Sequence, residues 1–403
     1  MRFFLALSFA AVVSALPASH GPEFGDDSPL SCARLPCNLE LVNQTYILPD
    51  PFHSIDGEPV TTLADWSCRA TQIRALFQKY ELGVKPPRPP VLTSTVSSSG
   101  VNVTAGDGTK SVTFSASISY PPSGTAPYPA IIAYDGLNVP RPAGAVIITL
   151  NVDTIAQQNG PQSRGVGVFY DLYGKDHSAG ALMAWAWAVS RIMDVLEATS
   201  ANINPRRIAV TGCSRNGKGA MVAGAFDQRI ALTIPQESGS GGDACWRVSR
   251  AMLVKDQLAT QTAWEIVGED VWFSTNFNQF ATDNYTVGLL PVDHHELAGL
   301  IAPRGLYSTE NVGFLWLGAQ SNWECMTAAN KIYQALGVAD RQGFSQDGPH
   351  DHCSFPYDQT AEIQAFYDRF LFGKEDTNTS VFRTVGNWTY DESWQPWSVP
   401  ELA

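Results

Sequence analysis

The sequence predicts an α/β fold in which a mostly parallel sheet is covered by helices on both faces. Short apolar segments with the length of buried strands recur along the chain. From residue 178 onwards, helical patterns separate most of these segments. Strands that alternate with helices are joined by right-handed crossovers, which produce a parallel sheet between two helical layers. The expected architecture is a three-layer sandwich.

Seven strands are expected, at residues 111–120, 129–136, 145–151, 207–212, 231–237, 312–318 and 342–346. The longest helical pattern, 178–198, begins at a Ser178 cap and is apolar round most of its surface, so we expect a buried helix. Two later helical patterns, 324–337 and 358–373, each end at a glycine. The small-residue run GAMVAGAF (219–226) is a further candidate helix.

The first 15 residues are typical of a secretory signal peptide. One arginine precedes an apolar run, and Val13-Ser14-Ala15 forms a small-residue cleavage site, so we expect removal after Ala15. That run is too short for a membrane anchor, and no later segment offers the roughly 20 uninterrupted apolar residues of a membrane helix. We therefore expect a soluble, secreted, extracellular protein that has no membrane partner.

The composition of the remaining chain, residues 16–403, narrows the function further. No Ser/Thr/Pro-rich linker, internal repeat or low-complexity tract divides it, so we expect one domain without a carbohydrate-binding module. The net charge of −13 argues against nucleic acid, whose binding needs basic patches. No His/Asp/Glu cluster has metal-ligand spacing, and we expect neither metal nor cofactor. Five sequons fit a glycosylated secreted protein: Asn43, Asn102, Asn284, Asn378 and Asn387.

The stretch TGCSRNGKGA (211–220) fits two different motifs. The spacing from Gly212 to Lys218 is that of a phosphate-binding loop, whereas Gly212-Cys213-Ser214 opens like a nucleophile elbow. A phosphate-binding loop needs Ser or Thr after the lysine to hold Mg²⁺, but here the residue is Gly219. We therefore expect Ser214 to be a nucleophile on a strand-to-helix turn.

A nucleophile elbow needs an acid and then a histidine later in the chain. The chain has seven histidines: His20, His53, His177, His294, His295, His350 and His352. The first three precede Ser214, and we expect His294 and His295 to be structural. His350 and His352 lie in a loop after the last strand expected, which is where such folds place the base.

The positions of two cysteines indicate which of these two histidines is the base. Cys213 directly precedes Ser214, and Cys353 directly follows His352. If Ser214 and His352 lie within hydrogen-bonding reach, their neighbours are close enough for a disulfide, which needs Cα atoms roughly 4.4–6.8 Å apart. We therefore predict a Cys213–Cys353 bridge and assign His352 as the base. For the acid, Glu237 ends a strand, while Glu324 and Asp347 remain options near the next one.

Several of these motifs together resemble the fungal glucuronoyl esterases of carbohydrate esterase family fifteen. The matching segments are GCSRNGKGA, IPQESG, HCSFP and FYDLYG…HSAGALMAWAW, and the resemblance runs from residue 48 to about 372. It implies an α/β-hydrolase fold with Ser214, Glu237 and His352 as the catalytic triad. It also implies hydrolysis of esters between 4-O-methyl-glucuronic acid of glucuronoxylan and lignin alcohols.

The resemblance also bears on substrate-binding residues. Arg215 and Lys218 begin a helix, whose dipole disfavours cations there, so a role beyond stability is expected. We expect Arg215 to stabilise the oxyanion and Lys218 to contact sugar hydroxyls. From residue types alone, Gln261 and Glu269 would be helix-surface residues and Trp316 a core residue, whereas the resemblance implies that all three bind sugar.

Three further expectations follow from the resemblance. It implies a Cys245–Cys325 disulfide, and it pairs Cys68 with either Cys32 or Cys37, of which we favour Cys32. Residues 374–403 depart from the family pattern and are expected to pack as an arm containing three tryptophans. We expect a monomer. The alternative functions are a secreted esterase acting on feruloyl or acetyl-xylan esters and an inactive polysaccharide-binding protein.

Overall fold

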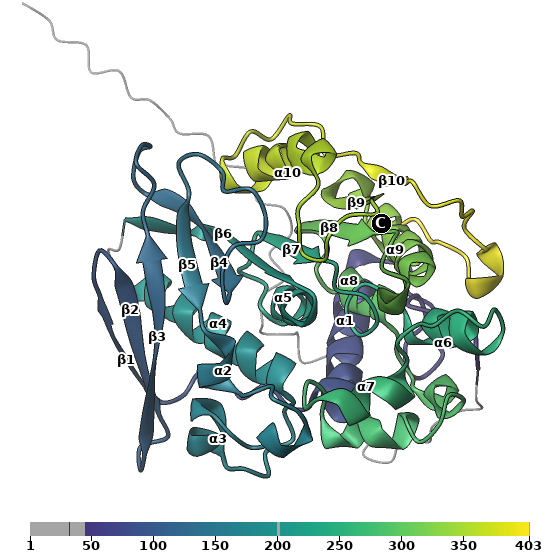
Figure 1. The fold of residues 1–403 in the computed structure, drawn as a ribbon, viewed down its shortest axis with the longest axis horizontal. Helices are drawn as coiled ribbons and strands as arrows, with labels where there is room; N and C mark the ends of the chain where they lie inside the picture. The colour runs from purple at the N-terminus through teal and green to yellow at the C-terminus, as the bar shows by residue number, and fades with distance from the viewer. Residues whose placement is uncertain (1–31, 33–44, 200–201, 403) are drawn as a thin grey trace, which may run out of the picture.

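The computed structural model describes residues 32, 45–199 and 202–402, and a ten-stranded sheet runs through its centre (Figure 1). The strands follow the order β1-β2-β3-β5-β4-β6-β7-β8-β9-β10. In this order, the pairs β1-β2, β2-β3 and β3-β5 are antiparallel, and every later pair, from β5-β4 to β9-β10, is parallel. The bounds are β1 (Val91–Val96), β2 (Gly100–Gly106), β3 (Ser111–Ser119), β4 (Tyr128–Tyr134), β5 (Val146–Leu150), β6 (Ile203–Cys213), β7 (Leu232–Gln236), β8 (Gly305–Asn311), β9 (Gln342–Asp347) and β10 (Phe382–Thr384).

Ten α-helices of the described chain surround this sheet (Figure 1). They are α1 (Leu63–Phe77), α2 (Val152–Ile155), α3 (Val168–Tyr173), α4 (Ala181–Ala198), α5 (Arg215–Phe226), α6 (Trp246–Val254), α7 (Ala263–Glu269), α8 (His294–Gly299), α9 (Ala319–Ala335) and α10 (Thr360–Phe366). No helix among the described residues is both long enough and apolar enough to cross a bilayer.

Strand β4 shows how the two faces are covered. Its side chains alternate between faces: Ile132 and Tyr134 join the larger core cluster with α1, α4, α5, α8 and α9, while Ile131 and Ala133 join a smaller cluster with α10. The predicted three-layer α/β arrangement is therefore confirmed. Six of the seven expected strands are present, with bounds shifted by a few residues.

The prediction of a strand at residues 312–318 is wrong. The strand in this region, β8, ends at Asn311, and Leu315–Leu317 form a 3₁₀ turn. Phe314, Leu315 and Trp316 are 36%, 46% and 40% exposed, so this apolar run lies on the surface. The true strand was overlooked because its second half, Ser308–Asn311, is polar although it is fully buried.

The start of the long helix also differs from the prediction. Helix α4 is buried almost throughout, as expected, but its N-cap is Gly180. Ser178 instead accepts a hydrogen bond from the N–H of Val84 at 3.1 Å. A Cβ atom at Gly180 would lie 2.3 Å from the carbonyl oxygen of Trp272, so this close approach requires glycine.

The C-terminal residues pack along the body of the protein (Figure 1). β10 extends the sheet in parallel beside β9. Trp397 is buried, with its ring centroid 5.6 Å from that of Phe52 and stacked 6.1 Å from that of His295. The expected signal peptide and Asn43 lie outside the described residues, whereas Asn102, Asn378 and Asn387 are exposed and Asn284 is partly buried.

Candidate active site

Ser214 occupies a sharp turn between β6 and α5. Its backbone has φ +60° and ψ −127°, a region that L residues rarely adopt. A Cβ atom at Gly212 would lie 2.5 Å from the carbonyl oxygen of Asn216, and one at Gly217 would lie 2.8 Å from that of Gln236. Glycine at both positions therefore permits the turn, which places Ser214 at the N-terminus of α5 as in a nucleophile elbow.

Glu237 and His352 meet at the end of the next strand. Glu237 follows β7 directly and is 1% exposed. Its Oε2 lies 2.8 Å from Nδ1 of His352, and its Oε1 accepts the backbone N–H of Cys353 at 2.8 Å. Because Nδ1 donates to the carboxylate, the lone pair of the neutral imidazole lies on Nε2, where a general base needs it.

The other residues considered for these roles are engaged elsewhere. Nδ1 of His350 lies 3.9 Å from Glu237 and only 3.0 Å from the carbonyl oxygen of Asp351. Glu324 accepts the backbone N–H of Asp391 at 3.0 Å, and Asp347 pairs with Arg383 at 3.4 Å. Of these candidates, Glu237 and His352 are the acid and histidine that pair.

A disulfide joins the elbow to the histidine loop. Cys213 and Cys353 are bridged with their Cα atoms 5.7 Å apart, and the bridge spans 140 residues of sequence. It links the residue before Ser214 to the residue after His352. The disulfide therefore connects the two segments that carry Ser214 and His352 directly.

Ser214 and His352 both line an open pocket of about 350 Å³. The other lining residues are Tyr134, Asp135, Asn138, Cys213, Arg215, Asn216 and Cys353. Asp135 lies just past the end of β4, and its Oδ2 accepts a 3.0 Å hydrogen bond from Asn216. The sequence analysis did not identify this side of the pocket, although the YDG sequence after an apolar strand was a usable signal, because ligands bind at the carboxyl ends of parallel strands.

Three of the residues expected to bind sugar, Gln261, Glu269 and Trp316, contact one another but do not line this pocket. The N–H of Gln261 donates to the carbonyl oxygen of Trp316 at 2.9 Å, and the Gln261 amide donates to the carboxylate of Glu269 at 2.5 Å. Gln261 is 3% exposed and precedes α7, so it is not a helix-surface residue, while Trp316 is exposed.

Lys218 is enclosed rather than solvated. It is 2% exposed, and its Nζ donates to the carbonyl oxygen of Ser238. Burial lowers the pKa of Lys218 to about 8, a shift that the negative charges of Glu310 and Glu269 partly oppose. Among the described residues, the bond to Ser238 uses one of the three N–H donors of this ammonium.

Two buried carboxyl groups that the sequence analysis missed bind Ser238, the residue whose carbonyl oxygen accepts the hydrogen bond of Lys218. Glu310 accepts hydrogen bonds from the backbone N–H of Ser238 at 2.7 Å and from Asn322 at 2.6 Å, and Asp243 accepts one from the Ser238 hydroxyl. Burial raises the pKa of both carboxyls, and the charge of Asp243 raises the pKa of Glu310 further. Together they fix the backbone immediately after Glu237.

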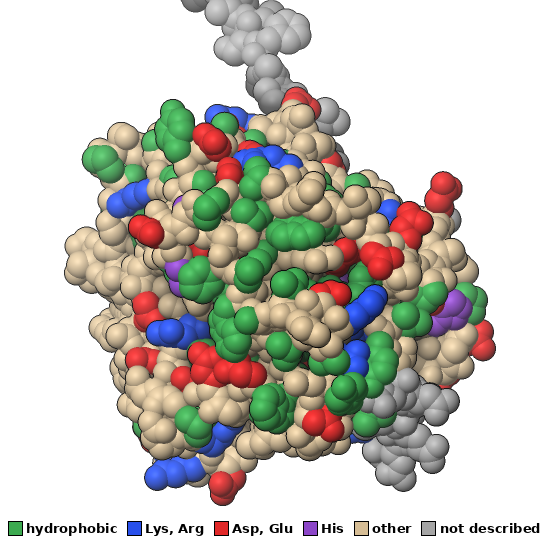
Figure 2. Space-filling view, turned by 45° about the vertical axis from the view of Figure 1, so that its right-hand side comes forward, with side chains coloured by type: hydrophobic (Ala, Val, Ile, Leu, Met, Phe, Trp, Pro, Cys, Tyr) green, Lys and Arg blue, Asp and Glu red, His purple; other side chains and the backbone are tan. Residues whose placement is uncertain are grey.

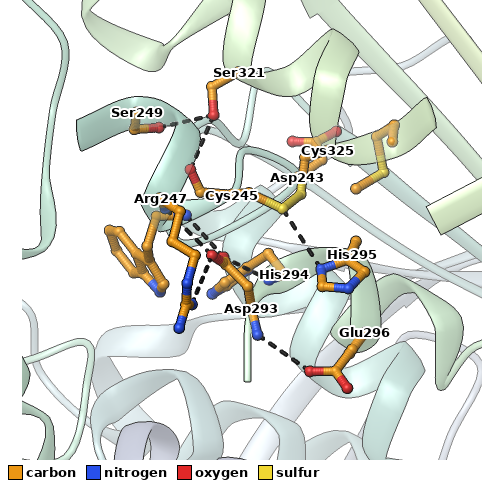
Figure 3. Close-up of a disulfide and its surroundings, with 12 residues drawn as sticks. Asp243, Cys245, Arg247, Ser249, Asp293, His294, His295, Glu296, Ser321 and Cys325 are labelled. Atoms are coloured by element: carbon orange, nitrogen blue, oxygen red, sulfur yellow. Dashed lines mark hydrogen bonds and ion pairs between the residues drawn. A yellow bond between two sulfur atoms is a disulfide. The ribbon is translucent and has the colours of Figure 1, made fainter. Parts of the chain in front are cut away.

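The loop after Glu237 is anchored at its far end by the Cys245–Cys325 disulfide (Figure 3). Ser321 on α9 donates to the carbonyl oxygen of Cys245 at 3.0 Å, and its hydroxyl lies 2.9 Å from that of Ser249. The third disulfide joins Cys32 to Cys68 on α1, and Cys37 falls outside the described residues.

His294 and His295 are buried below this loop and take no part in the pocket. His294 contacts the carbonyl oxygen of Gly242 through Nδ1 at 2.6 Å and Glu81 through Nε2 at 2.7 Å. Burial lowers the pKa of His295 to about 4, so this histidine is neutral. Both histidines connect helix α8 to neighbouring backbone.

Within the described chain, the one cluster with metal-binding donors is Cys213, His352 and Cys353. Its two sulfur atoms are joined in the disulfide, so they are not available as thiolate ligands.

The face in Figure 2 carries acidic and basic side chains in small separate groups, with hydrophobic side chains gathered between them.

Comparisons with known proteins agree with this geometry. A family model described as "Glucuronyl esterase, fungi" matches residues 101–337. The 4-O-methyl-glucuronoyl methylesterase of Phanerochaete carnosa is 48% identical over 417 residues, covering 100% of this chain and 99% of the relative. The corresponding protein of Hypocrea jecorina is 50% identical over 376 residues, covering 93% and 80%.

Solved structures give the same result. The glucuronoyl esterase catalytic domain from Hypocrea jecorina superimposes with a TM-score of 0.87 at 50% identity, covering 92% of this chain and 100% of the other. A serine-to-alanine mutant of the Sporotrichum thermophile glucuronoyl esterase, in complex with methyl 4-O-methyl-β-D-glucopyranuronate, matches with a TM-score of 0.85 at 43% identity, covering 90% and 97%.

Proposed function

This chain belongs to the fungal glucuronoyl esterase family, and from that premise we propose that it hydrolyses esters of 4-O-methyl-D-glucuronic acid by serine catalysis. The observation that carries the proposal is the 2.8 Å contact between Glu237 and His352, together with the pocket that His352 and Ser214 both line. The solved relative bound to a methyl glucuronate ester supports the choice of acyl group.

In the proposed reaction, Ser214 Oγ attacks the ester carbonyl while Nε2 of His352 takes its proton. The proton is then given to the departing alcohol oxygen, which leaves an acyl-enzyme on Ser214. A water molecule, deprotonated by His352, releases the uronic acid. Glu237 holds the imidazole in the required tautomer and stabilises its charged form.

Charge on the carbonyl oxygen is stabilised at the start of α5. Arg215, the residue after the nucleophile, begins α5, and the backbone N–H at this position is the usual oxyanion donor of a nucleophile elbow. The exposed Arg215 guanidinium also lines the pocket and supplies a positive charge. We assign Arg215 to the oxyanion site because it follows the nucleophile in the chain and lines the same pocket.

We assign recognition of the sugar to the polar side of the site. Lys218 donates to uronate hydroxyls, Gln261 and Glu269 bind through hydrogen bonds, and Trp316 offers an exposed ring to the pyranose. The link between Gln261 and Trp316 and that between Gln261 and Glu269 support a single binding surface.

The natural substrate we propose is the ester between glucuronoxylan and lignin alcohols, outside the cell. The signal-peptide sequence at residues 1–15, the exposed sequons and the three disulfides support a secreted glycoprotein. We propose one catalytic domain over residues 16–403, with 374–403 as its arm, acting as a monomer without a cofactor.

The function is tested by comparing kcat/KM for methyl esters of glucuronate, with and without the 4-O-methyl group, against acetyl-xylan and feruloyl esters. We expect the glucuronate esters to be preferred. Preference for an acetyl or feruloyl ester would refute the proposed substrate while keeping the serine chemistry.

A further inference from the structure

Phe314 lies flat against the catalytic histidine. Its ring and that of His352 are nearly parallel, at 15°, with centroids 4.6 Å apart. Phe314 is 36% exposed, so part of the ring remains open to a ligand. It follows β8 in the loop that the sequence had wrongly predicted as a strand.

The position of the leaving alcohol follows from the chemistry of His352. Nδ1 of this residue is taken by Glu237, so the proton passes to the alcohol oxygen from Nε2. The alcohol oxygen must therefore lie within hydrogen-bonding distance of that atom at the moment of transfer. A group attached to this oxygen extends beside the imidazole, where Phe314 lies.

The loop separates two kinds of surface. Its C-terminal part is tied to the sugar side, since the carbonyl oxygen of Trp316 accepts the N–H of Gln261 at 2.9 Å. Its N-terminal part carries Phe314 and Leu315, which are exposed and apolar. Hydrogen-bonding groups thus lie toward the acyl side, and an exposed aromatic ring lies toward the alcohol side.

We propose that Phe314 is a specificity-determining residue that stacks on the aromatic alcohol of the ester substrate. This inference rests on the proposed function, because it assigns the other half of the same ester. A phenyl group one or two bonds from the alcohol oxygen can reach the free edge of the Phe314 ring, and offset or edge-to-face contact is favourable. An alkyl alcohol as small as methanol cannot make this contact.

The test compares benzyl and methyl esters of glucuronic acid as substrates for purified wild-type protein and Phe314 variants. The quantity measured is the ratio of kcat/KM for the benzyl ester to that for the methyl ester. In Phe314→Ala we expect this ratio to fall roughly threefold to tenfold, the range of one aromatic contact. Phe314→Leu should lose most of the preference, and Phe314→Tyr should retain it because the ring is kept.

The rival explanation is that Phe314 only holds the His352 ring in place. In that case kcat of the variant would fall by the same factor for both esters. The ratio of kcat/KM for the two esters would then stay constant, and the proposal would be overturned. An unchanged ratio with unchanged rates would overturn it equally. Tyr128→Ala, which removes a partly buried ring that contacts Tyr120 at the opposite end of β4, controls for the loss of an aromatic side chain. Wild-type protein that cleaves neither ester would instead refute the proposed function.

Discussion

Glu237 and His352 are separated by 115 residues of sequence, yet their side chains meet at 2.8 Å, and the backbone N–H of the next residue, Cys353, bonds the second oxygen of the same carboxylate. One buried glutamate thereby orients both the histidine ring and the loop that carries it. The carboxylate lies directly after β7, one strand after the nucleophile, and its backbone φ of +44° directs it toward that loop.

Replacing Glu237 by glutamine should disable the enzyme without unfolding it. Glutamine is nearly isosteric but carries no charge to stabilise the imidazolium, so we expect kcat for a glucuronate ester to fall roughly 10³- to 10⁴-fold. Circular dichroism should be unchanged. Glu324→Gln is the matched control, because glutamine can still accept the N–H of Asp391 there, and its kcat should stay within twofold. Equal losses in both variants would contradict the assigned acid.

The lowered pKa of Lys218 predicts that substrate binding depends on pH. Burial lowers the pKa of Lys218 to about 8, so its ammonium is present below this pH and is lost above it. KM of the wild type for a glucuronate ester should therefore be constant at pH 6–7 and rise between pH 8 and 9.5. In Lys218→Met, KM should be about tenfold higher at pH 7, corresponding to roughly 1.4 kcal/mol, and should not rise further with pH. A wild-type KM that stays flat to pH 9.5 would argue against the assigned role.

Removing the Cys213–Cys353 disulfide should affect both stability and catalysis. Because the bridge spans 140 residues, the double variant Cys213→Ala/Cys353→Ala should lose roughly 4–5 kcal/mol of unfolding free energy in urea. Misplacement of Ser214 relative to His352 should also lower kcat by roughly tenfold to a hundredfold. The control, Cys32→Ala/Cys68→Ala, should be destabilised by roughly 4 kcal/mol with its kcat unchanged in the folded protein. Wild-type kcat in the first variant would show that the bridge only stabilises.

His294 should make stability depend on pH. Burial alone would lower its pKa, but the pKa is raised overall by the charge and hydrogen bond of Glu81, with smaller contributions from Asp293 and the Gly242 carbonyl. A raised pKa means that the folded state binds the proton more tightly. The stabilisation is therefore complete below the ordinary value of 6.5 and is lost as the pH rises through the folded pKa.

In urea unfolding, His294→Gln should lose more free energy at pH 5 than at pH 8, because the charged form is favoured in the folded state. The neighbouring His295, which stays neutral above pH 4, is present in both proteins and cancels in this difference. A larger loss at pH 8 than at pH 5 would contradict the charged state of His294.

Motif spacing predicted that the segments around Ser214 and His352 lie together, because each of these residues has a cysteine as its direct neighbour in the sequence. The Cys213–Ser214 and His352–Cys353 neighbours indicated a bridged pair, and the structure has that bridge. Gly212-Cys213-Ser214 indicated a sharp strand-to-helix turn, and a Cβ atom at Gly212 would lie 2.5 Å from the backbone of Asn216.

The hydropathy pattern predicted the wrong strand in the region where a buried segment is polar and an exposed segment is apolar. Residues 308–311 are fully buried polar residues in β8, and their side chains serve the site: Glu310 bonds Ser238, and Asn311 lies 3.4 Å from Glu237. Conversely, the apolar 314–316 segment is exposed beside His352. The strands β1 and β2 were missed because polar residues such as Thr93, Thr95 and Asn102 interrupt their apolar residues, although two β-branched runs flanking a Ser/Gly turn were a usable signal.

The most direct test of the account is the hydrolysis of methyl 4-O-methyl-D-glucuronate by wild type and Ser214→Ala, measured by release of the free acid. We predict that the wild type hydrolyses this ester in preference to acetyl and feruloyl esters, and that Ser214→Ala loses at least about 10⁴-fold in kcat while keeping its fold. A folded Ser214→Ala variant that retains more than about a hundredth of the wild-type activity would contradict the assignment of Ser214 as the nucleophile.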